Sequence, residues 1–335
     1  MFYEEIKKTE NSDLMWEYWQ EYRNKLTDLI ISNIESFNIK KELIKNKVIR
    51  LDNACSKEMF LSGTKKPTLA IWGAGGCNDI DIERLSDFFQ LVLIDCDAAS
   101  VNSAIEKYNV KEVCRYIDLK FWDISDDEYN LFEAMLIDGV EIETIREYLL
   151  ELSDKMAYYS HEAFQGFDYS VVVGLTSQLN ARFMALMEIY SDEERLKDKN
   201  IKRIYSRKDK EEIKCVIDDI NKKAVKKTFD LVNSITNNLV LYGYEIDWSD
   251  KMHCERLSDK CKNINDECEE NNNRLPVWAE KNLTCIMGAR ELETEIIEAL
   301  KKQKRRLFDC KGLIWNFTPK KEYLMLIVAL ERIEG

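Results

Sequence analysis

The sequence predicts an α/β fold with a mostly parallel sheet and helices on both faces. From Thr68 onward, short apolar runs alternate with helical stretches, and a glycine-rich turn follows the first run. The chain then closes with two β-rich segments around a tight turn. Alternation of strands and helices implies a parallel sheet with right-handed crossovers.

The individual elements follow from apolar periodicity and from Gly and Pro breaks. The expected strands span 68–72, 91–95, 113–122, 169–175 and 238–244, and the closing hairpin spans 307–317 and 323–330. The helical stretches between them are expected at 79–89, 98–107 and 127–163. Two longer helical inserts, at about 180–237 and 250–306, flank the strand 238–244.

An amphipathic helix is expected before the sheet, because apolar residues recur at three- and four-residue steps from Ser12 to Phe37. We therefore divide the chain into an N-terminal helical extension, 1–62, and a main domain, 63–335. The extension is rich in aromatic residues, which either close over a small-molecule pocket as a lid or pack in the core. These residues are Trp16, Tyr18, Trp19 and Tyr22.

Composition limits the partners. The 335 residues carry a net charge of -13, which opposes broad contact with nucleic acid or anionic membranes. The basic run from Lys301 to Arg306 is expected to be a solvated helix end. With no signal peptide and no apolar run of ~20 residues, the protein is expected in the cytoplasm, with its ten cysteines reduced.

The most informative segment is the run Gly73-Ala74-Gly75-Gly76, placed between a strand and a helix. Backbone amides in such a turn converge on the carboxyl edge of a parallel sheet and hold a ligand. The next strand ends in Asp95-Cys96-Asp97, where an acid accepts hydrogen bonds from ribose hydroxyls. Together they indicate an adenosine-containing ligand, unless the glycines serve only a tight turn.

NAD and S-adenosylmethionine both fit that outline. The dinucleotide fingerprint needs a third glycine, and Asn78 stands there, followed by Asp79. A carboxylate at the helix start repels a pyrophosphate but tolerates the ammonium and sulfonium of S-adenosylmethionine. S-adenosylmethionine is therefore the favoured ligand.

At these residues the sequence resembles class I methyltransferases, over roughly residues 67–331. Residues 71–81 resemble the GAGxCNDxDL run of a poorly characterised bacterial branch, and 171–179 are similar to its strand ending in SQL. The segment 93–97 and the closing hairpin also fit the family. The resemblance implies a Rossmann-like sheet of seven strands with an antiparallel C-terminal hairpin, and S-adenosylmethionine as cofactor.

The resemblance also implies which residues contact the cofactor. They are Gly73, Ala74, Gly75, Gly76, Asp79, Asp95, Cys96, Asp123, Ile124 and Leu175. The glycines would line the methionine end, Asp95 would take the ribose, and Asp123 would lie beside the adenine amine, with Asp118 as the alternative. The family often has an acid where Ile71 stands, so the methionine ammonium is held by Asp79 or lacks this anchor.

Methyl transfer depends mainly on holding donor and acceptor in line, and a hydroxyl or amine acceptor also needs a base. The candidates for that base are His161 and Tyr159, alongside His253 and Tyr158. A helix-end or surface position is the alternative reading for His161. Thr176, Ser177 and Gln178 end a strand, where they either contact ligand or cap a helix.

Cys254, Cys261 and Cys268 recur every seven residues, a spacing that indicates one face of a helix and no metal site. The sequence thus predicts S-adenosylmethionine-dependent methyl transfer to an unidentified small-molecule acceptor. An NAD(P)-dependent oxidoreductase and a catalytically inactive, cofactor-binding regulatory protein are the alternatives. The sequence names neither the acceptor nor the oligomeric state.

Overall fold

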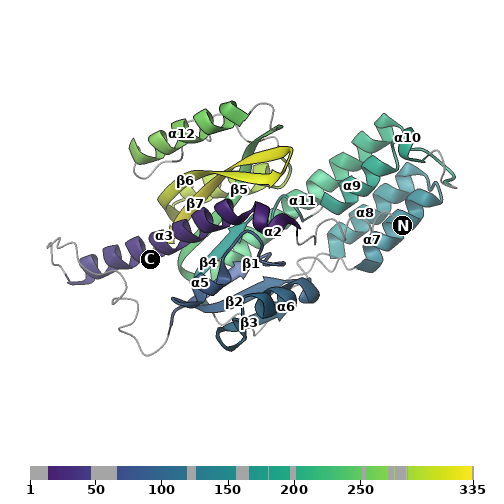
Figure 1. Ribbon diagram of the computed structural model, residues 1–335. Coiled ribbons are helices and arrows are strands. Elements are labelled where there is room, and N and C mark those ends of the chain that lie inside the picture. Colours follow the sequence, from purple (N-terminus) through teal and green to yellow (C-terminus); the bar gives the residue numbers. More distant parts are fainter. Residues whose placement is uncertain are drawn as a thin grey trace.

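The computed structural model describes residues 14–46, 66–118, 126–155, 166–179, 181–196, 201–250, 254–270, 275, 284 and 286–333. Within them lies one seven-stranded sheet with the strand order β3-β2-β1-β4-β5-β7-β6 (Figure 1). The strands are β1 Thr68–Trp72, β2 Gln90–Asp95, β3 Cys114–Asp118, β4 Phe167–Val173, β5 Thr236–Asp250, β6 Arg305–Thr318 and β7 Lys321–Arg332.

The first five strands are parallel, whereas β7 lies between β5 and β6 and is antiparallel to both. The predicted fold, a mostly parallel seven-stranded sheet with an antiparallel closing hairpin, is confirmed. Strand β3 ends at Asp118, and β5 is longer than expected because its second half pairs with β7 beyond the end of β4.

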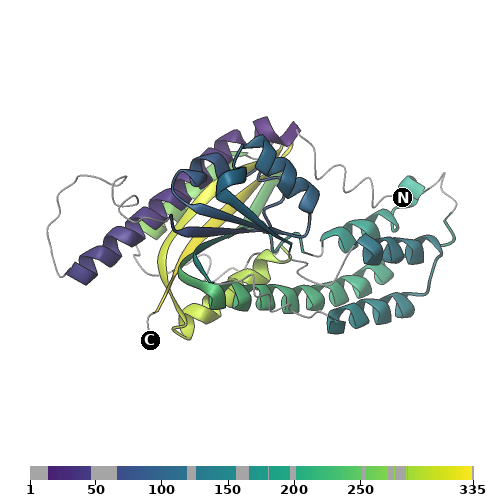
Figure 2. The same ribbon diagram turned by 90° about the horizontal axis from the view of Figure 1, so that it is seen from below.

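Two helical layers cover the sheet, because β1 is apolar on both faces. Leu69 and Ile71 face one core, and Ala70 and Trp72 face the other. The first core is covered by α3 Gln20–Asn46, α5 Ile82–Ser86 and α6 Ala98–Lys107; the second is covered by α11 Arg207–Ile235, α12 Cys254–Glu270 and α14 Ala289–Lys301. Figure 2 shows α3 lying along its face of the sheet.

Helix α3 belongs to the core. Its buried residues Tyr22, Leu26, Ile30 and Ile34 recur every four residues and form one apolar stripe. The expected single helix is divided into the short α2 Leu14–Tyr18 and α3, which continues to Asn46.

A helical bundle follows the carboxyl ends of β3 and β4 and extends away from the sheet (Figures 1 and 2). It contains α7 Asp126–Ile137, α8 Ile142–Lys155, α9 Ala181–Ile189, α10 Glu193–Leu196 and the first half of α11. The described part of the expected helical stretch 127–163 is two helices, because Gly139, at φ +67°, ends α7. A Cβ there would lie 2.8 Å from that of Arg203.

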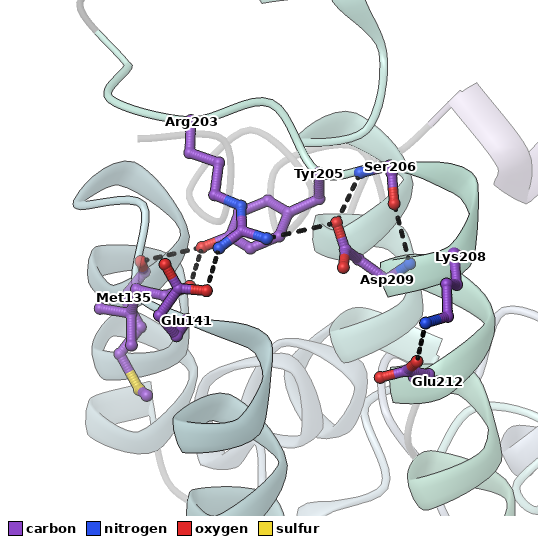
Figure 3. Close-up of polar contacts among 9 residues, drawn as sticks. Met135, Glu141, Arg203, Tyr205, Ser206, Lys208, Asp209 and Glu212 are labelled. Carbon is purple, nitrogen blue, oxygen red and sulfur yellow. Dashed lines mark hydrogen bonds and ion pairs between the residues drawn. The ribbon is translucent and has the colours of Figure 1, made fainter.

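The segment leading into α11 fastens this bundle (Figure 3). Arg203 donates to Glu141 at 2.7 Å, and the Tyr205 hydroxyl donates to the Val140 carbonyl at 2.9 Å. Ser206 and Asp209 then form a reciprocal capping box that begins α11. The α7–α8 turn is thereby tied to α11.

The basic run at the end of α14 was wrongly expected to be solvated throughout. Arg305 is only 4% exposed and donates to the carbonyls of Asn233, Thr236 and Asn238 at 2.6, 3.0 and 3.2 Å. It satisfies carbonyls at the C-terminus of α11, which have no partner inside the helix. Burial lowers the pKa of Arg305 to about 10.

Helix α12 carries the predicted cysteine face. Cys268 is buried, Cys261 is half-buried, and Asn265 between them exchanges two hydrogen bonds with the backbone of Gly312 on the edge strand β6. No cluster of metal-ligating side chains occurs in the described ranges. None of the described helices is long and apolar enough to cross a membrane.

Candidate functional site

The glycine turn lies at the carboxyl end of β1, as expected. Gly73 and Gly75 have φ values of +70° and +46°, which favour glycine. The Gly73 amide donates to the Ile94 carbonyl at 2.8 Å, so the turn folds back over the end of β2. A Cβ at Gly73 would lie 2.7 Å from Cδ1 of Leu175, which follows β4. The ends of β1, β2 and β4 therefore meet at this turn.

Asp95 ends β2 and binds the glycine turn directly. Its Oδ2 accepts a hydrogen bond from the Gly75 amide at 2.8 Å, and its Oδ1 accepts one from the Asp97 amide at 2.8 Å. Burial raises the pKa of Asp95, and these two amides oppose that rise. Cys96 is exposed beside it. Asp118 is paired in register with Asp95 at the end of β3 and is exposed.

Asp79 is half-buried in the loop before α5. Burial raises the pKa of its carboxyl to about 6, and the charge of Arg23 acts in the opposite direction. Asp79 was expected at the start of the helix. The structure differs, because the loop continues for two more residues. Asp81 is the N-cap instead, and its Oδ1 accepts from the Arg84 amide at 3.1 Å.

Helix α3 contacts this loop through two hydrogen bonds. Nη1 of Arg23, itself 5% exposed, donates to the Asn78 carbonyl at 3.0 Å. Thr27 Oγ1 accepts from the Asp81 amide at 3.0 Å. From α6, the Tyr108 hydroxyl lies 2.8 Å from the carbonyl of Cys77. The geometry of the turn therefore depends on helices from both sides.

A second group of polar residues follows the end of β4. Ser177 Oγ donates to Oε1 of Glu245 on β5 at 2.7 Å. Glu245 is 4% exposed, and its Oε2 has no hydrogen-bond partner among the described residues. The Thr176 hydroxyl is also buried without a partner there. Burial raises the pKa of Glu245, and the Ser177 hydrogen bond opposes the rise.

Aromatic side chains lie against this group. The rings of Tyr22 and Trp315 stack with centroids 5.2 Å apart, and Trp19 meets Trp315 edge to face at 5.0 Å. Burial raises the pKa of the Tyr22 hydroxyl well above its usual value, and the charges of Asp79 and Glu245 raise it further. The charges of both carboxyl groups therefore act on the Tyr22 hydroxyl.

The structure brings together most of the predicted cofactor residues at one sheet edge, namely Gly73, Ala74, Gly75, Gly76, Asp79, Asp95, Cys96 and Leu175. The predicted residues Asp123, Ile124, Tyr158, Tyr159, His161 and His253 lie outside the described residues. Sequence reasoning did not identify Glu245, although an isolated acid in the apolar run 239–246 was a signal. The role of Arg23 was also not apparent from the sequence, because its partner is the backbone carbonyl of Asn78.

No protein-family model matches the sequence, and no curated protein shows significant sequence similarity to it. In structure, the chain is similar to a SAM-dependent methyltransferase from Methanosarcina mazei, with a TM-score of 0.38 and 10% identity over 85% of this chain and 100% of that one.

Two further solved structures are similar to this chain. N-methyltransferase NodS from Bradyrhizobium japonicum WM9, in complex with S-adenosyl-L-homocysteine, gives a TM-score of 0.34 and 11% identity over 89% of this chain and 97% of that one. An O-methyltransferase family protein from Burkholderia thailandensis gives 0.34 and 7%, over 83% and 55%. The sheet of the present chain is a Rossmann-like, mostly parallel sheet of seven strands in which β7 is reversed.

Proposed function

We propose that this protein transfers the methyl group of S-adenosylmethionine to a small-molecule acceptor. The observation that carries the proposal is the hydrogen bond that Asp95 accepts from the Gly75 amide. It joins a carboxylate to a glycine turn at the carboxyl edge of a sheet whose β7 is reversed. Ligands of open α/β sheets bind at this edge.

The residues at this edge fit the adenosine half of the cofactor. Each carboxylate oxygen has about two acceptor positions, so Asp95 can hold its two backbone amides and still accept from ribose hydroxyls. Asp118, opposite Asp95 in register and exposed, would reach the adenine amine. Asp123, which the sequence favours for this role over Asp118, lies with Ile124 outside the described residues and stays a prediction.

The loop after the turn fits a ligand without phosphate. The carboxylate of Asp81 caps the start of α5, where a pyrophosphate would otherwise bind. Asp79, half-buried nearby, would hold the methionine ammonium. Ile71, where the family often has an acid, is 2% exposed in the core under α3, so a charge at that position would be buried.

When bound, S-adenosylmethionine supplies an electrophilic methyl group. The residues of this chain would orient it: Asp95 by the ribose, the glycine turn by its backbone amides, and Leu175 by packing against Gly73. Water would be excluded by α3, whose aromatic residues lie beside this edge. His161 and Tyr159 remain predicted candidates for a base.

The net charge of -13 favours a small molecule over nucleic acid as the acceptor. We also propose a cytoplasmic location.

A second function is favoured by one observation. Because Ile71 replaces an acid, the chain would bind the cofactor without turning it over if Asp79 fails to hold the methionine end. The protein would then be a cofactor-binding regulator.

A label-transfer assay tests the proposal. Purified protein is incubated with methyl-labelled S-adenosylmethionine and a cell extract separated into small molecules and macromolecules. We expect label in the small-molecule fraction, and less of it with Asp95→Ala at the same cofactor concentration. Label confined to macromolecules contradicts the acceptor class. Transfer to neither fraction, in a protein that binds S-adenosylhomocysteine, supports the regulator.

A further inference from the structure

The carboxyl group of Glu245 is buried, and only one of its two oxygens has a hydrogen-bond partner among the described residues. Its Oε1 accepts from Ser177, whereas Oε2 has no partner in the described part of the chain. A buried carboxylate is costly unless it is paired, so such an oxygen indicates a place where a donor binds. The proposed function has no other use for this residue.

The neighbours of Glu245 favour a cationic donor. The hydroxyl oxygen of Tyr22, which can accept a hydrogen bond, is also buried without a described partner. The rings of Tyr22 and Trp315 stack, and aromatic faces attract ammonium groups. Of the charged groups acting on this region, Asp79 adds negative charge near Tyr22, and Lys321 at the start of β7 partly offsets Glu245.

These residues adjoin the cofactor half of the site. Ser177 lies two residues after Leu175, which packs against Gly73. Trp315 lies against Gly174, since a Cβ on that glycine would be 3.9 Å from its ring. We call Tyr22, Ser177, Glu245 and Trp315 the Glu245 cluster.

We propose that the Glu245 cluster binds the ammonium group of the methyl acceptor, so that the acceptor is an amine. The ammonium gives one proton to the Glu245 carboxylate, and the neutral nitrogen then takes the methyl group as S-adenosylhomocysteine leaves. The inference rests on the proposed function. The ammonium would donate to Oε2 of Glu245 and to the hydroxyl oxygen of Tyr22, with the ring of Trp315 beside it. Because both partner atoms are buried, entry requires a shift of the first turn of α3, which carries Tyr22.

The first arm of the test uses methylammonium, the smallest organic probe with this group. Thermal unfolding is followed in methylammonium chloride and in sodium chloride at equal ionic strength. We expect methylammonium to raise the Tm of the wild type above its value in sodium chloride. The difference should vanish in Glu245→Gln and persist in Glu293→Gln, which alters a buried carboxyl in the other core.

No difference in the wild type, or an equal difference in Glu245→Gln, overturns the proposal. If Glu245→Gln does not fold, Tyr22→Phe replaces it, because it keeps the stacked ring and removes one acceptor oxygen. We expect that variant to need at least threefold more methylammonium for the same shift. An unchanged response of Tyr22→Phe then counts against the cluster.

The second arm separates the acceptor from the cofactor, since the methionine end of S-adenosylmethionine also carries an ammonium. Calorimetry with S-adenosylhomocysteine should give the same affinity, within twofold, for wild type and Glu245→Gln. A tenfold loss assigns Glu245 to the cofactor and overturns the proposal. A wild type that responds to methylammonium but does not bind S-adenosylhomocysteine refutes the proposed function while leaving the ammonium site standing.

Discussion

Asp95 fastens the glycine turn to the end of β2, because its Oδ2 accepts a hydrogen bond from the Gly75 amide at 2.8 Å. The same carboxylate would receive the ribose in the proposed complex. One residue therefore fixes the shape of the turn and recognises the ligand held by it, and both roles depend on its negative charge.

Asp95→Ala should weaken binding of S-adenosylhomocysteine by about 1–3 kcal/mol, because the ribose hydroxyls and the Gly75 amide lose their acceptor. Isothermal titration calorimetry measures this loss. Asp87→Ala is the matched control, since Asp87 is exposed at the other end of β2. An Asp95 variant with wild-type affinity would remove this residue from the site.

Gly73→Ala should destabilise the protein more than Gly75→Ala. Both glycines have positive φ, which costs other residues about 1–2 kcal/mol. Only at Gly73 would the new Cβ meet Leu175, at 2.7 Å, whereas nothing lies within 4 Å at Gly75. Urea unfolding measures the difference, and adding Leu175→Ala should reduce it. Equal destabilisation by the two variants would contradict the contact.

The raised pKa of Asp79 predicts a pH dependence of stability. Its pKa is about 6 in the folded protein and near 3.8 when unfolded, so the folded state binds more protons between these values. The free energy of unfolding should therefore fall as pH rises from about 4 to 6, by at most about 3 kcal/mol. Urea unfolding of Asp79→Asn should lack this component. Superimposable pH profiles for the two proteins would refute the assignment.

The same carboxyl predicts how ligand affinity varies with pH. If Asp79 binds the methionine ammonium in its charged form, S-adenosylhomocysteine should bind more tightly as pH rises through about 6. Calorimetry across pH 5–8 measures this change in affinity, because the range includes the pKa of Asp79. Asp79→Asn should bind weakly and show a flatter profile. A wild-type affinity independent of pH would exclude Asp79 from the ammonium.

Arg23→Ala should cost about 1–3 kcal/mol of stability, because it leaves the half-buried carbonyl of Asn78 without this donor. It should also weaken S-adenosylhomocysteine, since α3 no longer holds the loop. Arg84→Ala is the control: Arg84 pairs with Asp28 on the exposed surface, where such pairs contribute at most about 1 kcal/mol. Equal losses in denaturant unfolding would show that Arg23 does not hold the loop.

The sequence predicted the sheet well, because strands buried on both faces read as apolar runs bounded by glycine, proline and acids. β1 and α6 have the predicted bounds. The break at Gly139 was not predicted, since one glycine within a helical pattern does not by itself end a helix. The positive φ of Gly139 ends the helix, and the approach of Arg203, a tertiary contact, leaves no room for a Cβ there.

The cofactor half of the site was predictable, because glycines with positive φ and an acid after a strand are local in sequence. The Glu245 cluster was not. Tyr22, Ser177, Glu245 and Trp315 come from four separate segments, and only the order of the strands brings them together. The burial of Arg305 was missed for the same reason, since its acceptors Asn233 and Asn238 belong to α11 and β5, far from it in the sequence.

Titration calorimetry with S-adenosylhomocysteine and with NAD and NADP, on the same protein, shows which ligand binds at the glycine turn. We expect micromolar affinity for S-adenosylhomocysteine, on the order of -8 kcal/mol, and no measurable binding of either dinucleotide. Binding of NAD or NADP without binding of S-adenosylhomocysteine would contradict this expectation.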